Sequence, residues 1–128
     1  MAFCDNNNTA ITSTAYGEVR TYDMRGPRRA TGNFTVLEEH LIGSQLKMLT
    51  NIVQSQKNEH LLYAVSQEGT PIVIDRRLDC RVIRKMPGAK GSVRDAKVLT
   101  LENKDAESSE FLFTVGCDRH MRIFDASE

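Results

Sequence analysis

The chain has 128 residues, of which 40% are hydrophobic and 27% are charged, enough for one ordinary domain with a buried core. Its 17 basic and 17 acidic residues give no net charge, so no global field draws it to nucleic acid or to an anionic membrane. No apolar run approaches the roughly 20 residues that cross a bilayer. Three cysteines at unrelated spacings, Cys4, Cys80 and Cys117, favour free thiols in a reducing compartment.

The first expected strands are short and lie close together. They are Ala2 to Asp5, Ala10 to Ala15 and Glu18 to Asp23. Met24 to Thr31 contains glycine, proline and three arginines, so we expect a loop there. Asn33 to Leu37 restarts strand structure. Glu38 to Ser44 is open between loop and a single helical turn.

The strands expected further along the chain are clearer. They are Leu46 to Val53, His60 to Ser66, Pro71 to Asp75, Cys80 to Lys85, Ala96 to Leu101 and Phe111 to Asp125 with its turn. Leu61 to Val65 and Phe111 to Val115 are apolar on both faces, which predicts strands covered on two sides by neighbouring sheets. Pro71 has no backbone N–H and should be the first residue of its strand. The acidic stretch Glu102 to Glu110 is expected to project from one face.

One pattern occurs three times: a run of β-forming residues, a short turn, an alternating segment and an aspartate. The copies span 10–23, 61–75 and 111–125. Their closing aspartates, 52 and 50 residues apart, are Asp23, Asp75 and Asp125. A repeat of this length with several short strands is typical of a β-propeller blade.

The repeat predicts an all-β chain of about three antiparallel four-stranded blades, the first of them incomplete. The blade remnants are expected near 1–25, 33–77 and 80–126, with no separate second domain. Closed propellers contain roughly four or more blades, so we expect the chain to be part of a longer propeller.

Asp118 lies in the turn between the last two expected strands. An aspartate there can accept hydrogen bonds that tie the turn to a neighbouring strand. The other copies have Glu68 and Tyr16 at this position, so we predict a structural role for Asp118, as for the three closing aspartates, and no catalytic one.

Other motifs give weaker signals. Cys117 and His120 have a metal-like spacing, but a structural zinc site needs four ligands and no second pair has similar spacing. Gly88 to Ser92 lacks the spacing of a phosphate-binding loop. No nucleophile has a histidine at a shared spacing. We therefore expect no metal, no cofactor, no small-molecule substrate and no enzymatic activity.

Charge is segregated along the chain. Between Arg76 and Arg94, seven basic residues stand against one acid. Such a segment can bind RNA by releasing counterions from phosphates. The alternative is a solvated edge, since charged outer strands discourage edge-to-edge pairing.

Three stretches, in the same order and at compatible intervals, resemble the WD-repeat nucleolar assembly factors of the large ribosomal subunit. The stretches are 16–23 followed by Pro27, Arg28 and Arg29, then 88–94, then 116–123. Together with the linking strands, the resemblance covers most of the chain.

The resemblance implies a seven-bladed propeller that is not an enzyme and works in the nucleolus and nucleus. It would bind large-subunit precursors beside other assembly factors and pre-rRNA, without a membrane, until a hexameric AAA ATPase removes it. Gly88 and Ala89 then stand for the Gly-His pair of a WD repeat, and Asp118 for its turn aspartate. The usual tryptophan is replaced in each copy, by Tyr22, Ile74 and Phe124, so the hydrogen-bonded network of the repeat is incomplete.

The leading prediction is a non-catalytic scaffold in large-subunit assembly. The residues expected to contact partners or RNA are Arg28, Arg29, Lys90, Arg94 and Arg119. One alternative is a generic WD-repeat adaptor in another intracellular complex. Another is an enzyme with its site in the central channel, for which the sequence offers no convergent acids and histidine.

Overall fold

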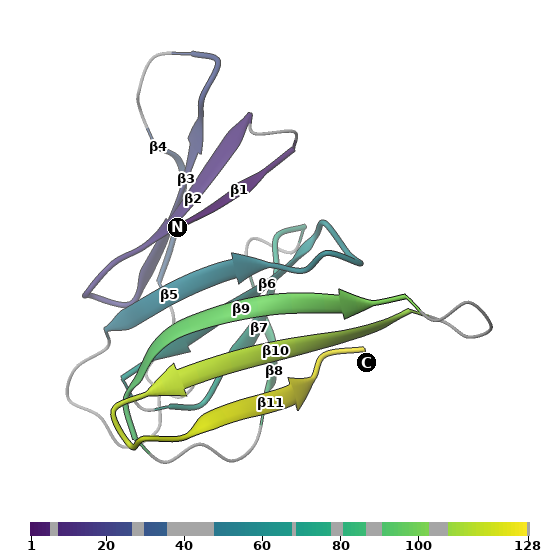
Figure 1. The fold of residues 1–128 in the computed structure, drawn as a ribbon. Coiled ribbons are helices and arrows are strands. Elements are labelled where there is room, and N and C mark those ends of the chain that lie inside the picture. The colour runs from purple at the N-terminus through teal and green to yellow at the C-terminus, as the bar shows by residue number, and fades with distance from the viewer. Residues whose placement is uncertain are drawn as a thin grey trace.

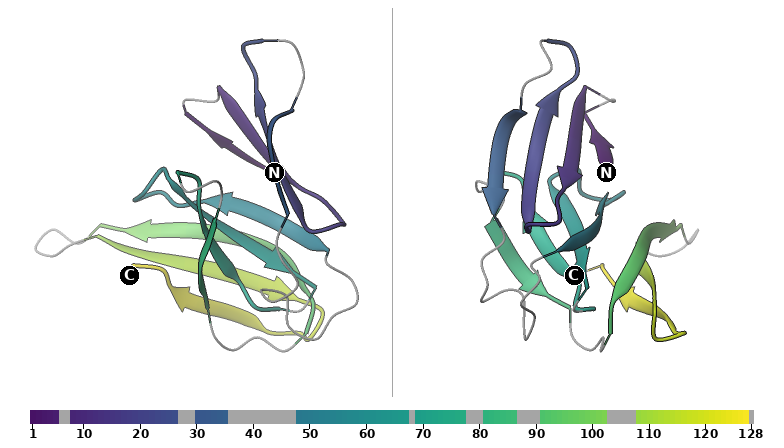
Figure 2. Two further views of the ribbon diagram at one scale, coloured as in Figure 1. Left: turned by 180° about the vertical axis from the view of Figure 1, so that it is seen from behind. Right: turned by 90° about the vertical axis from the view of Figure 1, so that its left-hand side faces the viewer.

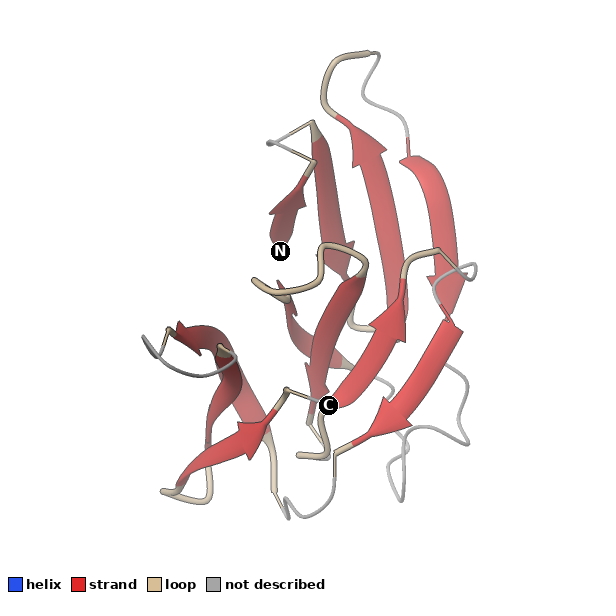
Figure 3. Ribbon diagram, turned by 90° about the vertical axis from the view of Figure 1, so that its right-hand side faces the viewer, coloured by secondary structure: helices blue, strands red, loops and turns tan. Residues whose placement is uncertain are grey.

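A computed structural model describes residues 1–5, 8–26, 30–35, 48–67, 69–77, 81–86, 91–102 and 108–127. These residues form strands and turns without a helix, which confirms the expected all-β class (Figure 3). The strands belong to three separate antiparallel sheets (Figure 1). In the part of the chain that is described, nothing helical could cross a lipid bilayer.

Each sheet is a series of strands in which sequence neighbours pair, as in consecutive hairpins. The first sheet contains β1 (Ala2–Cys4), β2 (Thr9–Ser13), β3 (Glu18–Asp23) and β4 (Ala30–Thr35). The second sheet contains β5 (Leu49–Gln54), β6 (Leu61–Ser66), β7 (Ile72–Asp75) and β8 (Arg81–Lys85). The third sheet contains β9 (Val93–Leu101), β10 (Ser109–Gly116) and β11 (Met121–Asp125).

The sheets divide the chain at different points from the expected blades near 1–25, 33–77 and 80–126. β4 pairs with β3 and completes the first sheet, and β8 pairs with β7 and completes the second. The third sheet is the short one among the described residues, with three strands. β4 overlaps the strand expected from Asn33, but it begins three residues earlier, at Ala30, inside the stretch expected to be a loop, because Gly32 and Asn33 are residue types that are uncommon in strands. β7 begins at Ile72, one residue later than expected, so Pro71 lies immediately before the strand and is not its first residue.

The three sheets repeat the same pairing register. Thr9 lies opposite Asp23, and the corresponding pairs in the other sheets join Leu61 to Asp75 and Phe111 to Asp125. The outer hairpins also share an irregularity, which falls between Thr21 and Tyr22 in the first sheet and between Val73 and Ile74 in the second. Residues of the three sheets can therefore be compared position by position.

The second sheet is the centre of the molecule, because both of its faces are covered. Leu62 and Ala64 of β6 belong to the hydrophobic cluster shared with the first sheet. Tyr63 and Val65 point the other way, into the cluster shared with the third sheet. All four are at most 1% exposed, which confirms the expectation of a strand covered on two sides. Figure 2 shows the second sheet between the other two.

For Phe111 to Val115 the same expectation is met on one face among the described residues. Leu112 and Thr114 are buried against the second sheet, whereas Phe113 is half-buried and Val115 is 44% exposed. The sequence is apolar on both faces, but no sheet of the described residues covers the second face.

Glu110 is the buried centre of the junction between the second and third sheets. Its side chain is almost fully buried, at 1% exposed. One carboxylate oxygen accepts hydrogen bonds from the Ser55 hydroxyl at 2.7 Å and the Tyr63 hydroxyl at 2.6 Å. The other accepts from the backbone N–H groups of Gln56 at 2.6 Å and Lys57 at 3.1 Å. Four donors from the second sheet thus satisfy a carboxylate of the third.

The sequence predicts that Glu110 belongs to an acidic stretch projecting from one face, and this prediction is wrong for Glu110, whose side chain is buried. Glu110 is the second residue of β10, so strand pairing turns its side chain toward the second sheet. Burial, and then the hydrogen bond to Glu110, raise the pKa of Tyr63. The Tyr63 hydroxyl therefore keeps its proton at neutral pH and remains a donor.

The substitution Glu110→Gln tests this junction. An amide cannot accept at both ends, so at least one donor pair loses its acceptor, and the free energy of unfolding should fall by about 1–3 kcal/mol. The matched control is Glu59→Gln, because the Glu59 side chain is 70% exposed. The control should change stability by less than about 0.5 kcal/mol in urea denaturation. Equal effects of the two substitutions would contradict the buried role of Glu110.

Candidate partner-binding surface

The closing aspartates form the same turn at the end of each third strand. One carboxylate oxygen of Asp23, Asp75 and Asp125 accepts the backbone N–H two residues further on, at 2.9 Å each time. This bond ends the strand and holds the turn that follows it.

Arginine strengthens two of these turns. The Arg25 guanidinium lies 3.0 Å from the Asp23 carboxylate, and that of Arg77 lies 2.9 Å from Asp75. These bonds lower the pKa of both aspartates, that of Asp23 to about 2. At Asp125 the backbone N–H and then the hydroxyl of Ser127 lower the carboxyl pKa. The three aspartates are engaged within their own turns.

Replacing Arg25 by alanine should move the pKa of Asp23 from about 2 toward its ordinary value of 3.8, as measured by carboxyl NMR during an acid titration. Because the folded pKa lies below the unfolded one, the turn stabilises the fold above pH 3.8, and this contribution is lost as the pH falls through 2. Arg20→Ala is the control, since Arg20 pairs with Glu18 instead. An Asp23 carboxyl that titrates near 3.8 in the unaltered chain would refute the assignment.

Asp118 ties the turn between β10 and β11 to β11. One of its oxygens accepts the backbone N–H of His120 at 3.2 Å, and the other lies 2.5 Å from the Arg122 guanidinium. Arg122 and this backbone bond lower the pKa of Asp118. Neighbouring Thr114 has a buried hydroxyl without a partner among the described residues, in keeping with an incomplete WD-repeat network.

Close backbone approach makes Gly116 necessary beside this turn. The backbone N–H of Cys117 donates to the Ser92 carbonyl at 2.9 Å. A Cβ atom on residue 116 would lie 2.4 Å from that same oxygen. Only glycine fits without moving the start of β9 away from β10.

The substitution Gly116→Ala should therefore lower the free energy of unfolding by about 1–3 kcal/mol. Gly26→Ala is the matched control, because a Cβ atom there meets nothing within 4 Å. The control should stay within about 0.5 kcal/mol of the parent chain in the same denaturation experiment. A neutral Gly116→Ala would show that the two strands can separate at no cost.

Two of the five expected contact residues fall within the described part of the chain. Arg94 and Arg119 are both exposed at the end of the third sheet where β9 begins and β10 turns into β11. Nε of Arg94 donates to Sγ of Cys117 at 3.1 Å, which brings Arg94 next to the turn that carries Arg119. Arg119 has a φ of 63°, so it sits at the left-handed position of the turn.

The other three, Arg28, Arg29 and Lys90, lie outside the described residues, as does the ambiguous stretch Glu38 to Ser44. Cys117 and His120 flank the same turn, but no group of three metal-ligating residues gathers anywhere in the described ranges.

The outer face of the third sheet is the largest feature that sequence analysis missed. This face points away from the second sheet, and its apolar side chains come from all three strands. They are Leu99, Leu101, Phe111, Phe113, Val115, Met121 and Ile123. Five of them are 44% to 63% exposed. The signal in the sequence was the alternation of apolar residues on these strands.

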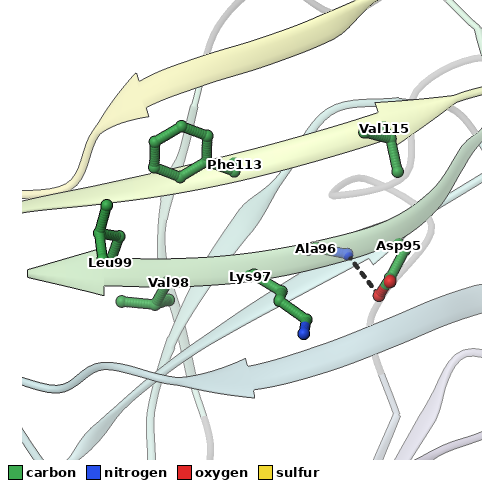
Figure 4. Close-up of a pocket in the computed structure, with 7 residues that line it drawn as sticks. All are labelled: Asp95, Ala96, Lys97, Val98, Leu99, Phe113 and Val115. Atoms are coloured by element: carbon green, nitrogen blue, oxygen red, sulfur yellow. Dashed lines mark hydrogen bonds between the residues drawn. The ribbon is translucent and has the colours of Figure 1, made fainter.

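A groove of about 420 Å³ runs along this outer face. Figure 4 shows Leu99 and Phe113 toward one end of the groove and Asp95 and Val115 toward the other, with Lys97 between them. Exposed apolar faces rimmed by charged residues are typical of protein-binding sites. The third sheet therefore combines an apolar face with a basic end.

Comparisons with known proteins agree with this fold. No family model matches the chain. The chain is 28% identical over 127 residues to the ribosome biogenesis protein NSA1 of Yarrowia lipolytica, an alignment that covers 90% of this chain and 29% of that protein. It superposes on the crystal structure of Sqt1 from Saccharomyces cerevisiae with a TM-score of 0.73 and 16% identity, covering 97% of this chain and 29% of Sqt1.

The chain thus spans less than a third of the length of either protein. Its three sheets have the arrangement of β-propeller blades, and its sequence is similar to that of a ribosome biogenesis protein, which confirms the resemblance to WD-repeat ribosome assembly factors.

Proposed function

We propose that this chain is part of a non-catalytic scaffold in the nucleolar assembly of the large ribosomal subunit, and that its three sheets belong to one propeller. The observation that carries the proposal is the 28% identity to NSA1 over 127 residues. Its partners are other assembly factors of the large-subunit precursor. An AAA ATPase releases it from that precursor.

The geometry supports a binding role in two ways. The outer face of the third sheet offers apolar surface to a protein. The end of that sheet offers Arg94 and Arg119 to an anionic partner such as pre-rRNA. Arg28, Arg29 and Lys90 are proposed as further contacts from the sequence alone. Four aspartates accept hydrogen bonds within their own turns, which supports a structural role for them; they are Asp23, Asp75, Asp118 and Asp125.

The proposal is tested by purifying the tagged full-length protein that contains this chain from its own cells. Pre-rRNA sequencing and mass spectrometry of the bound particles should show large-subunit precursors and their assembly factors, and imaging should show the protein in the nucleolus. Recovery of a ubiquitin-ligase or trafficking complex without precursor rRNA would instead support the generic adaptor.

RNA contact at the basic end is tested by the double variant Arg94→Glu, Arg119→Glu. Each arginine that neutralises a phosphate contributes to the salt dependence of binding, so the variant should bind precursor rRNA roughly tenfold or more weakly and lower the salt slope by about 1 to 2. The matched control, Arg94→Lys with Arg119→Lys, keeps both charges and should bind nearly as the parent does. Unchanged affinity of the glutamate variant across salt concentrations would remove both residues from the interface.

A further inference from the structure

The turn between the second and third strands of each sheet has the same length in all three sheets. The paired residues that flank it are Thr12 and Arg20, Ala64 and Ile72, and Thr114 and Arg122. The fifth residue after the first member of each pair is Gly17, Gly69 or Arg119. All three are left-handed, with φ of 77°, 89° and 63°. Arginine therefore stands where the other two copies have glycine.

Glycine suits this position and arginine does not. Gly17 and Gly69 each donate the backbone N–H to the carbonyl three residues earlier, at 3.2 Å, which closes the turn. Glycine adopts a positive φ without steric cost, whereas the Cβ atom of another residue comes too close to the following carbonyl oxygen. The third sheet thus holds Arg119 in a conformation that lowers stability.

Asp5 shows what such a conformation can gain. It is the other non-glycine residue with a positive φ among the described residues, at 54°. Its carboxylate accepts from the Thr9 hydroxyl at 2.7 Å and from the Arg76 guanidinium at 2.8 Å, which links the first sheet to the second. The exposed side chain of Arg119 makes no hydrogen bond or ion pair with any residue that the structure describes. Strained residues without an internal role cluster at sites that bind another molecule.

The turn that carries Arg119 is basic. The neighbouring carboxylate of Asp118 is already bound by the Arg122 guanidinium, 2.5 Å away. Arg94 lies beside the turn, and its Nε donates to a thiol and not to a carboxylate. Arg94 and Arg119 therefore keep guanidinium N–H groups for an anion. Phosphate suits them, because one guanidinium can donate two parallel hydrogen bonds to it.

His120 offers an aromatic ring next to the same arginine. Its side chain is 70% exposed, and Nδ1 lies 2.7 Å from the Asp118 carbonyl oxygen. A carbonyl oxygen only accepts hydrogen bonds, so Nδ1 donates and this bond holds the ring in place. The other copies have Glu18 and Thr70 at this position. Exposed aromatic rings stack on the unpaired bases of single-stranded RNA, whereas the bases of a duplex are already stacked on one another.

We propose that this turn of the third sheet binds single-stranded RNA, with Arg119 on a phosphate and His120 stacked on the adjacent base. Arg94 supplies a second phosphate contact. The inference rests on the proposed function in that the RNA is precursor rRNA, and it adds that unpaired segments are bound and that Arg119 is retained at a cost in stability. The turn lies at the end of the sheet and on neither face, so RNA does not compete with sheet packing.

The test uses the full-length protein that contains this chain and a single-stranded RNA of about 12 nucleotides as the probe. Arg119→Gly removes both the charge and the steric cost. The melting temperature should rise by roughly 1–3 °C, while the RNA affinity, measured by fluorescence anisotropy, should fall roughly tenfold and the salt slope by about 1. Because the variant gains stability, unfolding cannot account for its lower affinity.

The matched control is Arg25→Ala. Arg25 is also exposed, with a side chain 68% accessible, but it follows the third strand of its sheet and so lies at the opposite end from the turns compared above. Its removal should leave RNA affinity unchanged. The converse substitution, Gly69→Arg, should lower the melting temperature, because it introduces the same strain into the second sheet.

The role of His120 is tested separately. His120→Ala should weaken binding of the same RNA roughly fivefold or more without changing the salt slope, because stacking by a neutral imidazole neutralises no phosphate. His120→Phe keeps a flat ring and should restore the affinity. The parent protein should bind a duplex of the same sequence more weakly than the single strand.

An Arg119→Gly protein that binds the single strand as tightly as the parent, or that melts at a lower temperature, would overturn the proposal. Equal binding of duplex and single strand would also overturn it, as would tighter binding of poly-glutamate than of RNA, which would assign the turn to an acidic protein. Failure to recover large-subunit precursors from cells, with the RNA binding intact in vitro, would count against the proposed function and leave this inference standing.

Discussion

The burial of β6 on both of its faces is the constraint on which the rest of the structure depends. Leu62 and Ala64 hold the first sheet, and Tyr63 and Val65 hold the third. Each fully buried side chain of leucine or valine size contributes about 1.5–3 kcal/mol relative to exposure. Side chains alternate along a strand, so a slip of one residue would exchange the two sets and turn the Tyr63 hydroxyl away from Glu110. Two different neighbours thus specify one register.

The two junctions of the second sheet are held by different chemistry. Toward the first sheet, the polar contacts are an ion pair in which Arg76 lies 2.8 Å from Asp5, and a backbone hydrogen bond of 3.2 Å from the Leu49 N–H to the Thr14 carbonyl. Toward the third sheet, the tie is the buried Glu110 network, supported by a bond of 2.8 Å from the Thr50 hydroxyl to the Val93 carbonyl. Exposed ion pairs contribute about 0–1 kcal/mol, whereas a buried and fully satisfied network is harder to open.

The features that could be predicted from the sequence depend on residues close together in the chain, and the features that could not depend on pairing between distant segments. The closing aspartates and the two-sided character of Leu61 to Val65 follow from residues close in the chain, and the structure shows both. The membership of β4 and the burial of Glu110 depend on which strand lies alongside, which alternation alone does not reveal. The exposure of the outer face of the third sheet could not be predicted for the same reason, since a strand apolar on two sides has the same sequence whether or not a neighbour covers it.

The divergence of the three copies has a structural use. In every sheet, a backbone N–H just after the closing aspartate donates to the carbonyl of one repeat position, occupied by Asn8, His60 and Glu110. These bonds, of 2.7 to 2.8 Å, involve the backbone alone, so the side chain at that position is free to differ. Glu110 fits only against a sheet that supplies hydroxyl and N–H donors, and an aliphatic surface would leave its charge unpaired. Conserved backbone bonds keep each sheet alike, while the variable side chains decide which sheet it packs against.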